Sequence, residues 1–455
     1  MTATDSKISA LTELTSISSA DYVPIVDAGD LSVTKRATLA NIFAQIVSGS
    51  AGYAPSNETV ATDPIWDAAG DIVYGTGANT AARLPIGTAT QVLTVNTGAT
   101  APEWADATGG GGGGIGENIL INGDFVISQR ETTFTSVTVP ANSDDTYLID
   151  RWVLLSDGND IVDVSQVAGS AGNALGSRAF AKFDIETEDK KWGILQIVKF
   201  DDSAQLIGGS CSLSFKAARG ASDTSTLLRA AVLSWSGTAD TVTSDVVSAW
   251  GNEGTSPTLV AGWTYEDGSY ACGLTDAWQT FKVEGIAIDT ANTSNIAVFI
   301  WSDDKTNAVG DLVHITDVKL EKGATCTDFI PRPEGTELQL CQQYYETNVE
   351  CGIIPKNGAT LPTHYFGGAT SSTNVQCRCD YAISKFKIPT ITFYRSSANE
   401  TGDNLWDVFI GGWTDSTATS ITASTKNAFV SRCTGTYTST GAYMINGIWT
   451  AESEL

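Results

Sequence analysis

The clearest alternation of apolar and polar positions lies in the middle of the chain and predicts β-strands. In CSLSFKA, the residues Cys211, Leu213, Phe215 and Ala217 alternate with polar neighbours, which is the two-residue period of a strand with one buried face. FKVEGIAI and LVHITDVKL show similar patterns, and the apolar run NIAVFIW predicts a strand buried on both faces. Turn-forming clusters such as WSGTAD and WSDDKTN separate these pieces. Residues 117–333 are therefore predicted to form an all-β sandwich.

A second β unit is predicted over residues 334–455. It opens with a short helix in ELQLCQQYYE and continues with strands in YAISKFKI, TITFYR, NAFVSR and AYMINGIW. At the start of the sandwich region, ENILINGDF also has the pattern of a strand. We find no internal repeat of about 20–50 residues, which weighs against a long β-helix.

The first 50 residues contain the one clear helical pattern. An extended stretch, DYVPIVDAGDLSVTK, leads into TLANIFAQIVSG, where Thr38 suits a helix start and Gly49 a helix end. The apolar positions at helical spacing are Leu39, Ile42, Phe43, Ile46 and Val47. One short helix cannot bury such a stripe alone. We interpret residues 1–50 as an attachment segment whose helix packs on another chain or on a copy of itself; the alternative is docking on its own domain.

Residues 51–108 predict a thin shaft. They are low in charge, rich in Gly, Ala and Thr, and contain two short β-like pieces, DIVYGTG and QVLTVN. Neither piece has enough apolar residues for its own core, so we expect several copies to wind together, with a disordered linker as the alternative.

Six consecutive glycines at 109–114 mark the sharpest boundary, and residues 109–116 predict a flexible hinge. Gly111, Gly113 and Gly116 match the spacing G-x-G-x-x-G. No strand pattern precedes them and no helix pattern follows, so this spacing does not predict a dinucleotide site.

Charge and length narrow the range of partners. The chain has 455 residues, enough for roughly three domains, and a net charge of −26 from 26 basic and 52 acidic residues. Such a chain repels nucleic acids and anionic membranes. It shows neither a signal-peptide pattern nor an apolar run of about 18 residues. We expect synthesis in a cytoplasm, no nucleic-acid partner and no membrane insertion.

The residues that carry chemistry give no enzyme pattern. The only histidines are His314 and His364, and no P-loop or G-x-S-x-G sequence occurs. Cys377 and Cys379 are separated by one residue, too close for the usual zinc pairing, so buried free thiols are expected. A glycosidase carboxylate pair stays open, because nothing singles out two of the 52 acidic residues.

Tryptophan is the more useful signal, with 12 residues. Exposed aromatic rings stack on the apolar faces of sugars. The aromatic residues in or beside expected loops and strand ends are Trp235, Trp250, Trp263, Tyr265, Trp301 and Trp413. These are candidate ligand-binding residues, with burial in the core as the alternative for each.

Several stretches resemble the tail-fibre proteins of tailed bacteriophages. KISALTEL, DYVPIVD and TKRATLANI look like an attachment region, and WDAAGDIVYGTGANTAARLPIGTATQVLTVNTGATAPEW is similar to a shaft segment. NILINGDFVISQR and HITDVKLEKGATCTDFIPRPEGTELQLCQQYYE resemble a carbohydrate-binding-module-like jelly roll, and NGIWTAESEL a C-terminal fibre strand. The resemblance implies a homotrimer, anchored to other tail or head proteins by its N-terminus, with receptor-facing C-terminal β domains.

The resemblance also implies a structural calcium site at Asp124 and Asp317. Val126 and Thr316 stand where related modules carry further carboxylates, and calcium prefers six to eight oxygen ligands.

The expected function is that of a virion fibre that binds a host-surface receptor, a glycan or a protein, without enzymatic activity. A purely structural appendage, such as a head fibre or tail connector, is the first alternative. A polysaccharide-cleaving tailspike is the second.

Overall fold

The computed structural model describes residues 20, 22–27, 30–42, 68–77, 80–88, 91–96, 98–106, 117–169, 178–221, 223–225, 227–290, 293–303, 307–356, 359, 364–395, 405–438 and 440–455. The chain divides into two compact units, Met1–Ala107 and Thr108–Leu455. The predicted hinge at 109–116 lies outside the described residues.

The strands described in the first unit form antiparallel hairpins. The pairs are β1 (Tyr22–Asp27) with β2 (Asp30–Thr38), β3 (Ile72–Gly77) with β4 (Thr80–Leu84), and β5 (Gln91–Val95) with β6 (Pro102–Asp106). The strands predicted in DIVYGTG and QVLTVN are confirmed as β3 and β5.

A helix follows β2 where the sequence predicts one. Its described residues are 39–42, and the Asn41 amide donates to Thr38 Oγ1 over 3.2 Å. Thr38 therefore caps the first turn as expected. Leu39 and Ile42 are half-buried. Phe43, Ile46 and Val47 lie outside the described residues.

The second unit begins with a sandwich of two antiparallel sheets. The first sandwich sheet has the order β18 (Gln279–Ala287), β13 (Ser210–Arg219), β20 (Leu312–Lys322), β11 (Ala179–Ile185), β10 (Val162–Ala168) and β7 (Thr133–Phe134). The second sandwich sheet has the order β17 (Trp263–Gly273), β14 (Leu227–Trp235), β19 (Asn295–Ser302), β12 (Trp192–Val198), β9 (Val153–Ser156) and β8 (Thr146–Tyr147). From β11 to β14 successive strands alternate between the sheets, as in a jelly roll.

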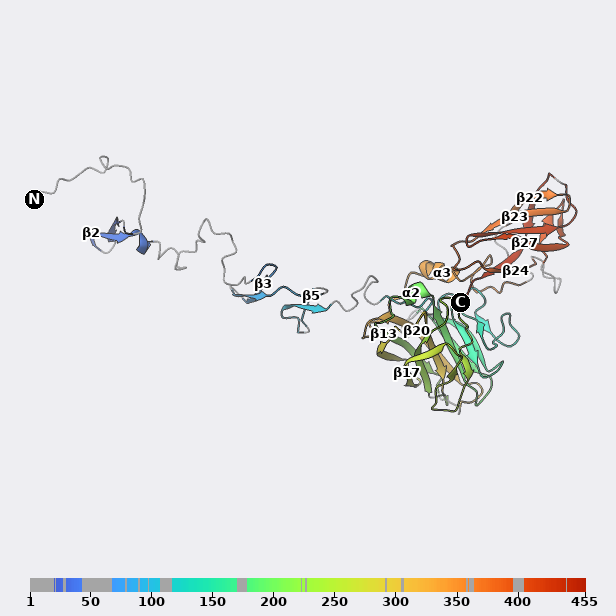
Figure 1. Ribbon diagram of the computed structural model, residues 1–455, viewed down its shortest axis with the longest axis horizontal. Coiled ribbons are helices and arrows are strands. Elements are labelled where there is room, and N and C mark those ends of the chain that lie inside the picture. The colour runs from blue at the N-terminus through green and yellow to red at the C-terminus, as the bar shows by residue number, and fades with distance from the viewer. Residues whose placement is uncertain are drawn as a thin grey trace, which may run out of the picture. The chain divides into compact units, whose positions relative to one another are not determined.

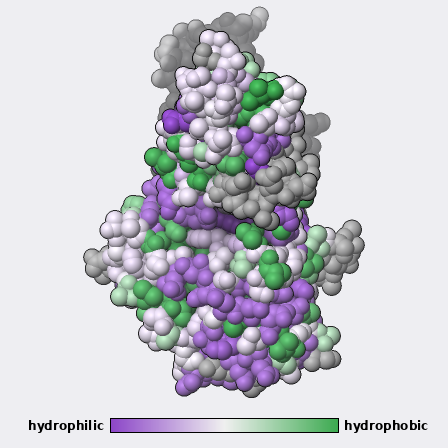
Figure 2. All heavy atoms as spheres, turned by 90° about the vertical axis from the view of Figure 1, so that its right-hand side faces the viewer, coloured by the Kyte–Doolittle hydropathy of each residue, from purple (hydrophilic) through white to green (hydrophobic). Residues whose placement is uncertain are grey.

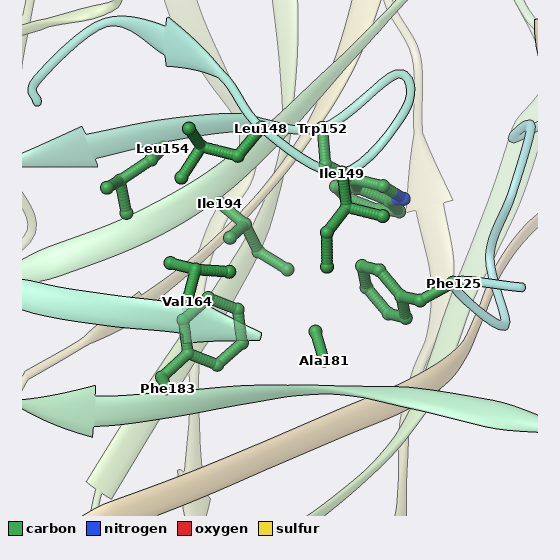
Figure 3. A pocket seen from close by; sticks show the side chains of 9 residues that line it. All are labelled: Phe125, Leu148, Ile149, Trp152, Leu154, Val164, Ala181, Phe183 and Ile194. Carbon is green, nitrogen blue, oxygen red and sulfur yellow. The ribbon is translucent and has the colours of Figure 1, made fainter. Parts of the chain in front are cut away.

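The sandwich core lies between these sheets and follows the predicted alternation. Cys211, Leu213, Phe215 and Ala217 all point into it. Every residue of β19 is buried, so the strand predicted to be buried on both faces is confirmed. The core leaves a cavity of about 10 Å³ around Phe125 and Trp152, lined only by apolar side chains (Figure 3). That is about the space of one water molecule, so it holds no ligand.

The strand predicted in ENILINGDF is wrong. This stretch is irregular, because the buried Asn118 side chain takes over hydrogen bonds that a strand ladder would use. Asn118 Oδ1 accepts from the amides of Leu120 and Leu320, each over 3.0 Å, and Nδ2 donates to the Val318 carbonyl over 2.9 Å. The segment therefore lies along β20 without completing a strand pair.

The C-terminal region of the second unit also consists mainly of strands and starts with helix α3 (Glu334–Gln342), while its division from the sandwich as a separate domain remains a prediction. A three-stranded sheet contains β21 (Tyr345–Thr347), β30 (Ile448–Glu452) and β24 (Thr390–Tyr394). The sheet named here the C-terminal sheet has the order β26 (Trp413–Asp415), β25 (Asp407–Phe409), β29 (Ala442–Asn446), β22 (Tyr365–Ser371), β23 (Asn374–Asp380), β28 (Ala428–Thr434) and β27 (Ala418–Ser424). A third core, around Trp406 and Phe429, includes residues from both sheets.

The strand predicted in YAISKFKI is also wrong, because one charged side chain holds that segment in an irregular path. Lys385 is buried, and its Nζ pairs with Glu346 and donates to the Gln342 carbonyl. Burying an ammonium requires these partners, and the Lys385 amide donates to the Lys426 carbonyl over 2.7 Å, outside any strand pair.

The C-terminal residues join the two β regions of this unit. Figure 1 shows the C-terminus beside α2 (Phe200–Ser203) and α3. The Ser453 amide donates to the Tyr344 carbonyl over 2.7 Å. Glu454 is buried and pairs with Arg130 over 3.2 Å and with Arg151.

The described residues are mostly β, which confirms this part of the predicted fold class, while the N-terminal anchor and the homotrimer remain predictions. Among them, no helix is long and apolar enough to cross a membrane. The face in Figure 2 mixes apolar, neutral and hydrophilic residues, with the hydrophilic ones most extensive in its lower half.

Candidate functional site: an exposed aromatic stripe

Four of the six aromatic residues predicted to bind ligand lie on the outer face of the second sandwich sheet, and a fifth, Trp250, lies on a segment that covers this face. They belong to or pack against a second hydrophobic core outside the sandwich interior. Trp301 is fully buried, and Trp263 and Trp250 are only 4% and 9% exposed. Trp235 and Tyr265 are half-buried.

Two parts of the chain close this face. One is the excursion between β14 and β17, which carries β15 (Val247–Ala249) and β16 (Thr258–Leu259) and packs Trp250 on Phe299 at 6.1 Å between ring centroids. The other is the start of the C-terminal region, through Cys341 and Tyr344. Trp301, Trp263 and Trp250 are therefore core residues, and their prediction as a ligand surface is wrong.

The two half-buried residues, Trp235 and Tyr265, form hydrogen bonds with the same excursion. Tyr265 Oη donates to the Pro257 carbonyl over 2.7 Å, and Trp235 Nε1 donates to the Thr238 carbonyl over 3.2 Å. The Tyr265 hydroxyl and the Trp235 indole N–H therefore both donate within the protein.

A buried ion pair anchors the excursion. Asp303 lies 2.6 Å from Lys191 Nζ and 2.6 Å from Arg229 Nε. The same Lys191 donates to the Asn252 carbonyl over 2.9 Å, and the Gly254 amide donates to Asp303 over 3.1 Å. The side chains of Lys191 and Asp303 are fully buried, so the cover is fixed rather than loosely laid on the sheet.

The sixth predicted aromatic residue, Trp413, is exposed, and it has exposed neighbours. On the C-terminal sheet Trp413 is 43% exposed, Phe409 40% and Phe366 77%. With Met444, which is half-buried, these residues form what we name the aromatic stripe.

The pairing of four neighbouring strands places the residues of the aromatic stripe side by side. Phe409 on β25 pairs with Trp413 on β26, and Phe366 on β22 pairs with Met444 on β29. Val408 pairs with Ile445, which places Phe409 next to Met444. Because Trp406, Val408 and Ile445 point into the third core, their alternate neighbours must face outward.

A row of polar residues runs beside the aromatic stripe. Asp407 on β25 pairs with both Asp415 on β26 and Asn446 on β29. His364 lies just before β22, with its ring 5.0 Å from that of Trp413. Among the described residues nothing forms a hydrogen bond with the buried Asn446 Oδ1. A buried acceptor without a hydrogen bond lowers the stability of the fold by about 1–3 kcal/mol unless a hydroxyl or a water molecule donates to it.

This arrangement suits a ligand with apolar faces and hydroxyl edges. Asp415 carries a charge-assisted bond from Arg395 over 2.7 Å and is half-exposed, so its carboxylate keeps a fixed position beside Trp413. Aromatic rings supply the stacking surface, and the amide and carboxylate groups supply hydrogen bonds.

The predicted calcium residues do not fit a metal. Asp124 lies 2.7 Å from the Arg178 guanidinium, and Asp317 lies 2.8 Å from Lys216 Nζ. The two aspartates are neighbours, since the Val318 amide donates to the Gly123 carbonyl over 2.8 Å. No group of three or more His, Cys, Asp or Glu side chains in the described part of the chain could hold a metal ion. Two protein cations thus lie where a calcium ion would be expected.

The cysteines are free thiols, as predicted, and six of the eight are buried. Cys377 contacts Ser431 Oγ at 3.0 Å, and burial raises the pKa of the Cys433 thiol to about 12. These thiols fill core positions rather than a reactive site.

Phe366 and Phe409 were missed by sequence reasoning, although the sequence held a signal for each. In HYFGG, Tyr365 and Phe366 are adjacent, so only one can face the core of a strand. In WDVFIGGW, Trp406 and Val408 alternate with Asp407 and Phe409. Only the fold shows which alternate set faces outward.

No protein-family model and no curated protein matches this sequence. Among solved structures, a carbohydrate-binding module named TmCBM61, in complex with β-1,4-galactotriose, shares 14% identity at a TM-score of 0.25 and covers 45% of this chain and 99% of its own. The enzymatically active domain of tailspike protein 4 from bacteriophage CBA120 shares 14% identity at 0.26 and covers 45% of this chain and 21% of its own. A cyclase from Fischerella sp. TAU shares 13% identity at 0.26 and covers 47% of this chain and 99% of its own. Likeness at this level assigns neither a family nor a ligand.

Proposed function

We propose that this chain is a fibre protein of a tailed-bacteriophage virion that binds a host-surface glycan through the aromatic stripe. The observation that carries the proposal is the exposed row of Trp413, Phe409 and Phe366 beside the polar row of Asp415, Asp407 and Asn446. A contiguous apolar patch on an exposed sheet marks an interaction surface. Its aromatic composition and adjacent hydrogen-bonding groups favour a sugar over a purely apolar partner.

The first unit supports assembly of several copies. Exposed apolar residues occur on β5, at Val92, Leu93 and Val95, and just after β4, at Ile86. Burial of such residues between copies would stabilise a shaft that one chain cannot stabilise alone. A homotrimer built in this way would present three aromatic stripes, so weak contacts with single sugars would add up through avidity.

The remaining parts of the proposal rest on the sequence. Residues 1–50 attach the fibre to tail or head proteins, and the chain is made in the host cytoplasm and acts on the virion. It is not an enzyme. In support, His364 lies against Trp413, and His314 lies between Phe180 and Trp278 at 5.1 and 5.9 Å. Both rings thus serve as packing or stacking groups.

The test is binding of the full chain to an array of bacterial surface polysaccharides, followed by competition with the virus on cells that carry the bound glycan. We expect the chain to bind at least one glycan and to block adsorption in a dose-dependent way. A variant with Trp413→Ala and Phe366→Ser should lose both effects while keeping its circular dichroism spectrum.

Two outcomes would replace the proposed function by another. Folded chain that binds no glycan and blocks no adsorption would indicate a structural appendage. Release of shorter oligosaccharides from a bound polysaccharide would indicate a depolymerase.

A further inference from the structure

We propose that the glycan bound by the aromatic stripe carries an anionic group, a carboxylate or a phosphate, and that Arg432 binds this group. The inference rests on the proposed function, because it assigns a ligand class to the face of the C-terminal sheet that holds the aromatic stripe. It adds a contact point on that face, apart from the aromatic rings. The observation that carries it is an arginine that has no partner in the described part of the protein.

Arg432 on β28 differs from the other arginines of the second unit. Its side chain is half-buried and forms neither a hydrogen bond nor an ion pair with any described residue, and its Nε is buried in this state. Every other arginine of the second unit has a side-chain hydrogen bond or an ion pair, and nearly all of them bind a carboxylate. In a chain with 52 acidic residues and 26 basic ones, this is unexpected. A guanidinium without a partner favours binding of a carboxylate or a phosphate.

Strand register places no carboxylate beside Arg432. Its cross-strand partners are Gln376 on β23 and Ser420 on β27. On β28 itself, Val430 and Thr434 are its neighbours on the same face. Its diagonal neighbours include Arg378, Asn374 and Ala418. The surroundings of Arg432 on the sheet are therefore neutral or basic.

Gln376 supplies a second donor beside Arg432. The Gln376 side chain is half-buried and has no hydrogen-bond partner among the described residues. Val375, Cys377 and Cys433 point into the third core, so Gln376 and Arg432 both face outward. A side-chain amide next to a guanidinium can donate to the same anion. The cross-strand pair thus offers several N–H donors to one anionic group.

Small residues leave an open path from the aromatic stripe to this pair. Gly368 on β22 pairs with Ala442 on β29 and with Gln376 on β23. Gly368 and Ala442 are exposed, and a Cβ added at Gly368 would meet nothing within 4 Å. Phe366 lies two residues before Gly368 and therefore on the same face of β22. No large side chain stands between Phe366 and Gln376 along this path.

The spacing suits an oligosaccharide rather than a single sugar. β22, β23 and β28 are consecutive strands of the C-terminal sheet, in which Figure 1 labels β22 and β23. Arg432 is two strands away from Phe366 and two positions further along the sheet. With about 4.8 Å between strands and about 3.4 Å per residue, their backbones lie about 12 Å apart. A glycan of two or more sugars can stack on Phe366 and place an anionic group at Arg432.

The two sides of the aromatic stripe differ in charge. On β29 the outward residues follow in the order Ala442, Met444 and Asn446. Asn446 pairs with Asp407, so the acidic side chains lie on one side of the aromatic stripe and Arg432 on the other. An anionic group is repelled from the first side and attracted to the second, which fixes the direction of the glycan. Charges more than about 8 Å away are largely screened at physiological ionic strength, so the net charge of the chain does not cancel this attraction.

The test uses the full chain and the polysaccharides that it binds on the array. Each polysaccharide is measured unaltered, after carbodiimide activation and borohydride reduction, which turn carboxylates into primary alcohols, and after hydrogen fluoride treatment, which removes phosphate. Size exclusion checks that the polysaccharide length is kept. We expect the affinity to fall about ten- to hundredfold when the anionic group is removed, as for loss of a charge-assisted hydrogen bond. Loss in the reduced form identifies a carboxylate, and loss after hydrogen fluoride identifies a phosphate.

Three variants complete the design. Arg432→Gln should reduce the affinity for the unaltered polysaccharide by the same factor and leave the affinity for the neutral form unchanged. Arg432→Lys should restore part of the loss, because an ammonium keeps the charge but not the paired donors. Lys426→Gln is the matched control, since it removes the positive charge of an exposed residue just before β28 of the same sheet, and should keep full affinity. Circular dichroism should show that all three variants fold as the unaltered chain does.

The outcomes separate this inference from the proposed function. Binding that depends on Trp413 but survives removal of the anionic groups, or that involves only neutral polysaccharides, would overturn the role of Arg432 and leave the proposed function standing. Equal losses in Arg432→Gln and Lys426→Gln, or an equal loss of the charged and neutral forms in Arg432→Gln, would also overturn it. Folded chain that binds no polysaccharide would refute the proposed function and this inference with it.

Discussion

Phe409 and Trp413 face each other across the β25–β26 pair, with ring centroids 5.5 Å apart and planes at 72°. Edge-to-face contact of this kind contributes about 0.5–1.5 kcal/mol beyond simple burial. It holds two large exposed rings in a fixed geometry at the end of a sheet. Fixed rings lose little entropy when a ligand binds, so this pair is the centre of the proposed glycan site.

Replacing Trp413 by alanine should weaken glycan binding about tenfold or more, and because the ring is largely exposed the loss of stability should be little more than the ring contact with Phe409, about 0.5–1.5 kcal/mol. Affinity of the full chain for the array-selected glycan measures the first effect, and thermal unfolding measures the second. Ile421→Ala is the matched control, since Ile421 is 40% exposed on β27 of the same sheet. Equal loss in both variants would show that the stripe has no special role.

Removing the buried carboxylate of Asp303 should destabilise the second unit strongly. Asp303→Ala leaves Lys191 charged and buried without its partner, which costs about 3–5 kcal/mol. Urea unfolding followed by tryptophan fluorescence measures the loss. In Asp184→Ala the pair broken is Lys182–Asp184, whose side chains are 30% and 28% exposed, so the change should stay below about 1 kcal/mol. Similar losses in the two variants would contradict the anchoring role assigned to Asp303.

Calcium and chelators should leave stability unchanged. Since Arg178 and Lys216 already neutralise Asp124 and Asp317, EDTA should shift the unfolding temperature by less than about 1 °C, because a ligand stabilises a protein only when it binds the folded state. Arg178→Ala should lower the unfolding temperature, because it leaves the charged carboxylate of the buried Asp124 without its ion-pair partner. A clear stabilisation of the unaltered chain by millimolar calcium would contradict this assignment.

Stability should rise as pH falls from neutral toward about pH 5. Burial raises the pKa of Asp163 to about 6, helped by the nearby charges of Glu186, Asp160 and Asp184. The folded state therefore binds a proton more tightly than the unfolded state, whose pKa is near 3.8. The resulting stabilisation is complete below the unfolded pKa and is lost as pH rises through about 6.

Asp163→Asn isolates this contribution. The variant should be more stable than the unaltered chain at neutral pH and should show a weaker pH dependence of the unfolding temperature. Asp267→Asn, on the other sandwich sheet, serves as a charge-matched control. An unchanged pH profile in Asp163→Asn would refute the role of this residue.

The amino-acid sequence alone determined the strands whose alternation spans a whole segment. β13, β18, β19 and β20 lie where two-residue periodicity or a continuous apolar run predicts them. This works because the side-chain direction alternates along any strand, whatever it pairs with. The start of the helix at Thr38 could also be predicted from the sequence, because an N-terminal cap involves residues only three positions apart.

The strand predictions failed in two segments where a single polar side chain determines the path of the backbone. Asn118 and Lys385 turn two strand-like segments into irregular ones by binding groups that lie far away in sequence. Nothing local to ENILINGDF or YAISKFKI shows those partners.

The placement of the aromatic residues was decided only by the tertiary structure. Trp301 ends the apolar run NIAVFIW and Trp413 follows two glycines, and both were named as candidate ligand-binding residues with burial as the alternative. Trp301 is buried because the excursion after β14 and the start of the C-terminal region cover its sheet face, whereas no described residue covers Trp413 to the same extent. Burial depends on which distant segments pack over a face, and alternation along one strand carries no information about them. The sequence thus identified Trp413 as a candidate but neither Phe366 nor Phe409, and the packing of remote segments decided which aromatic residues reach solvent.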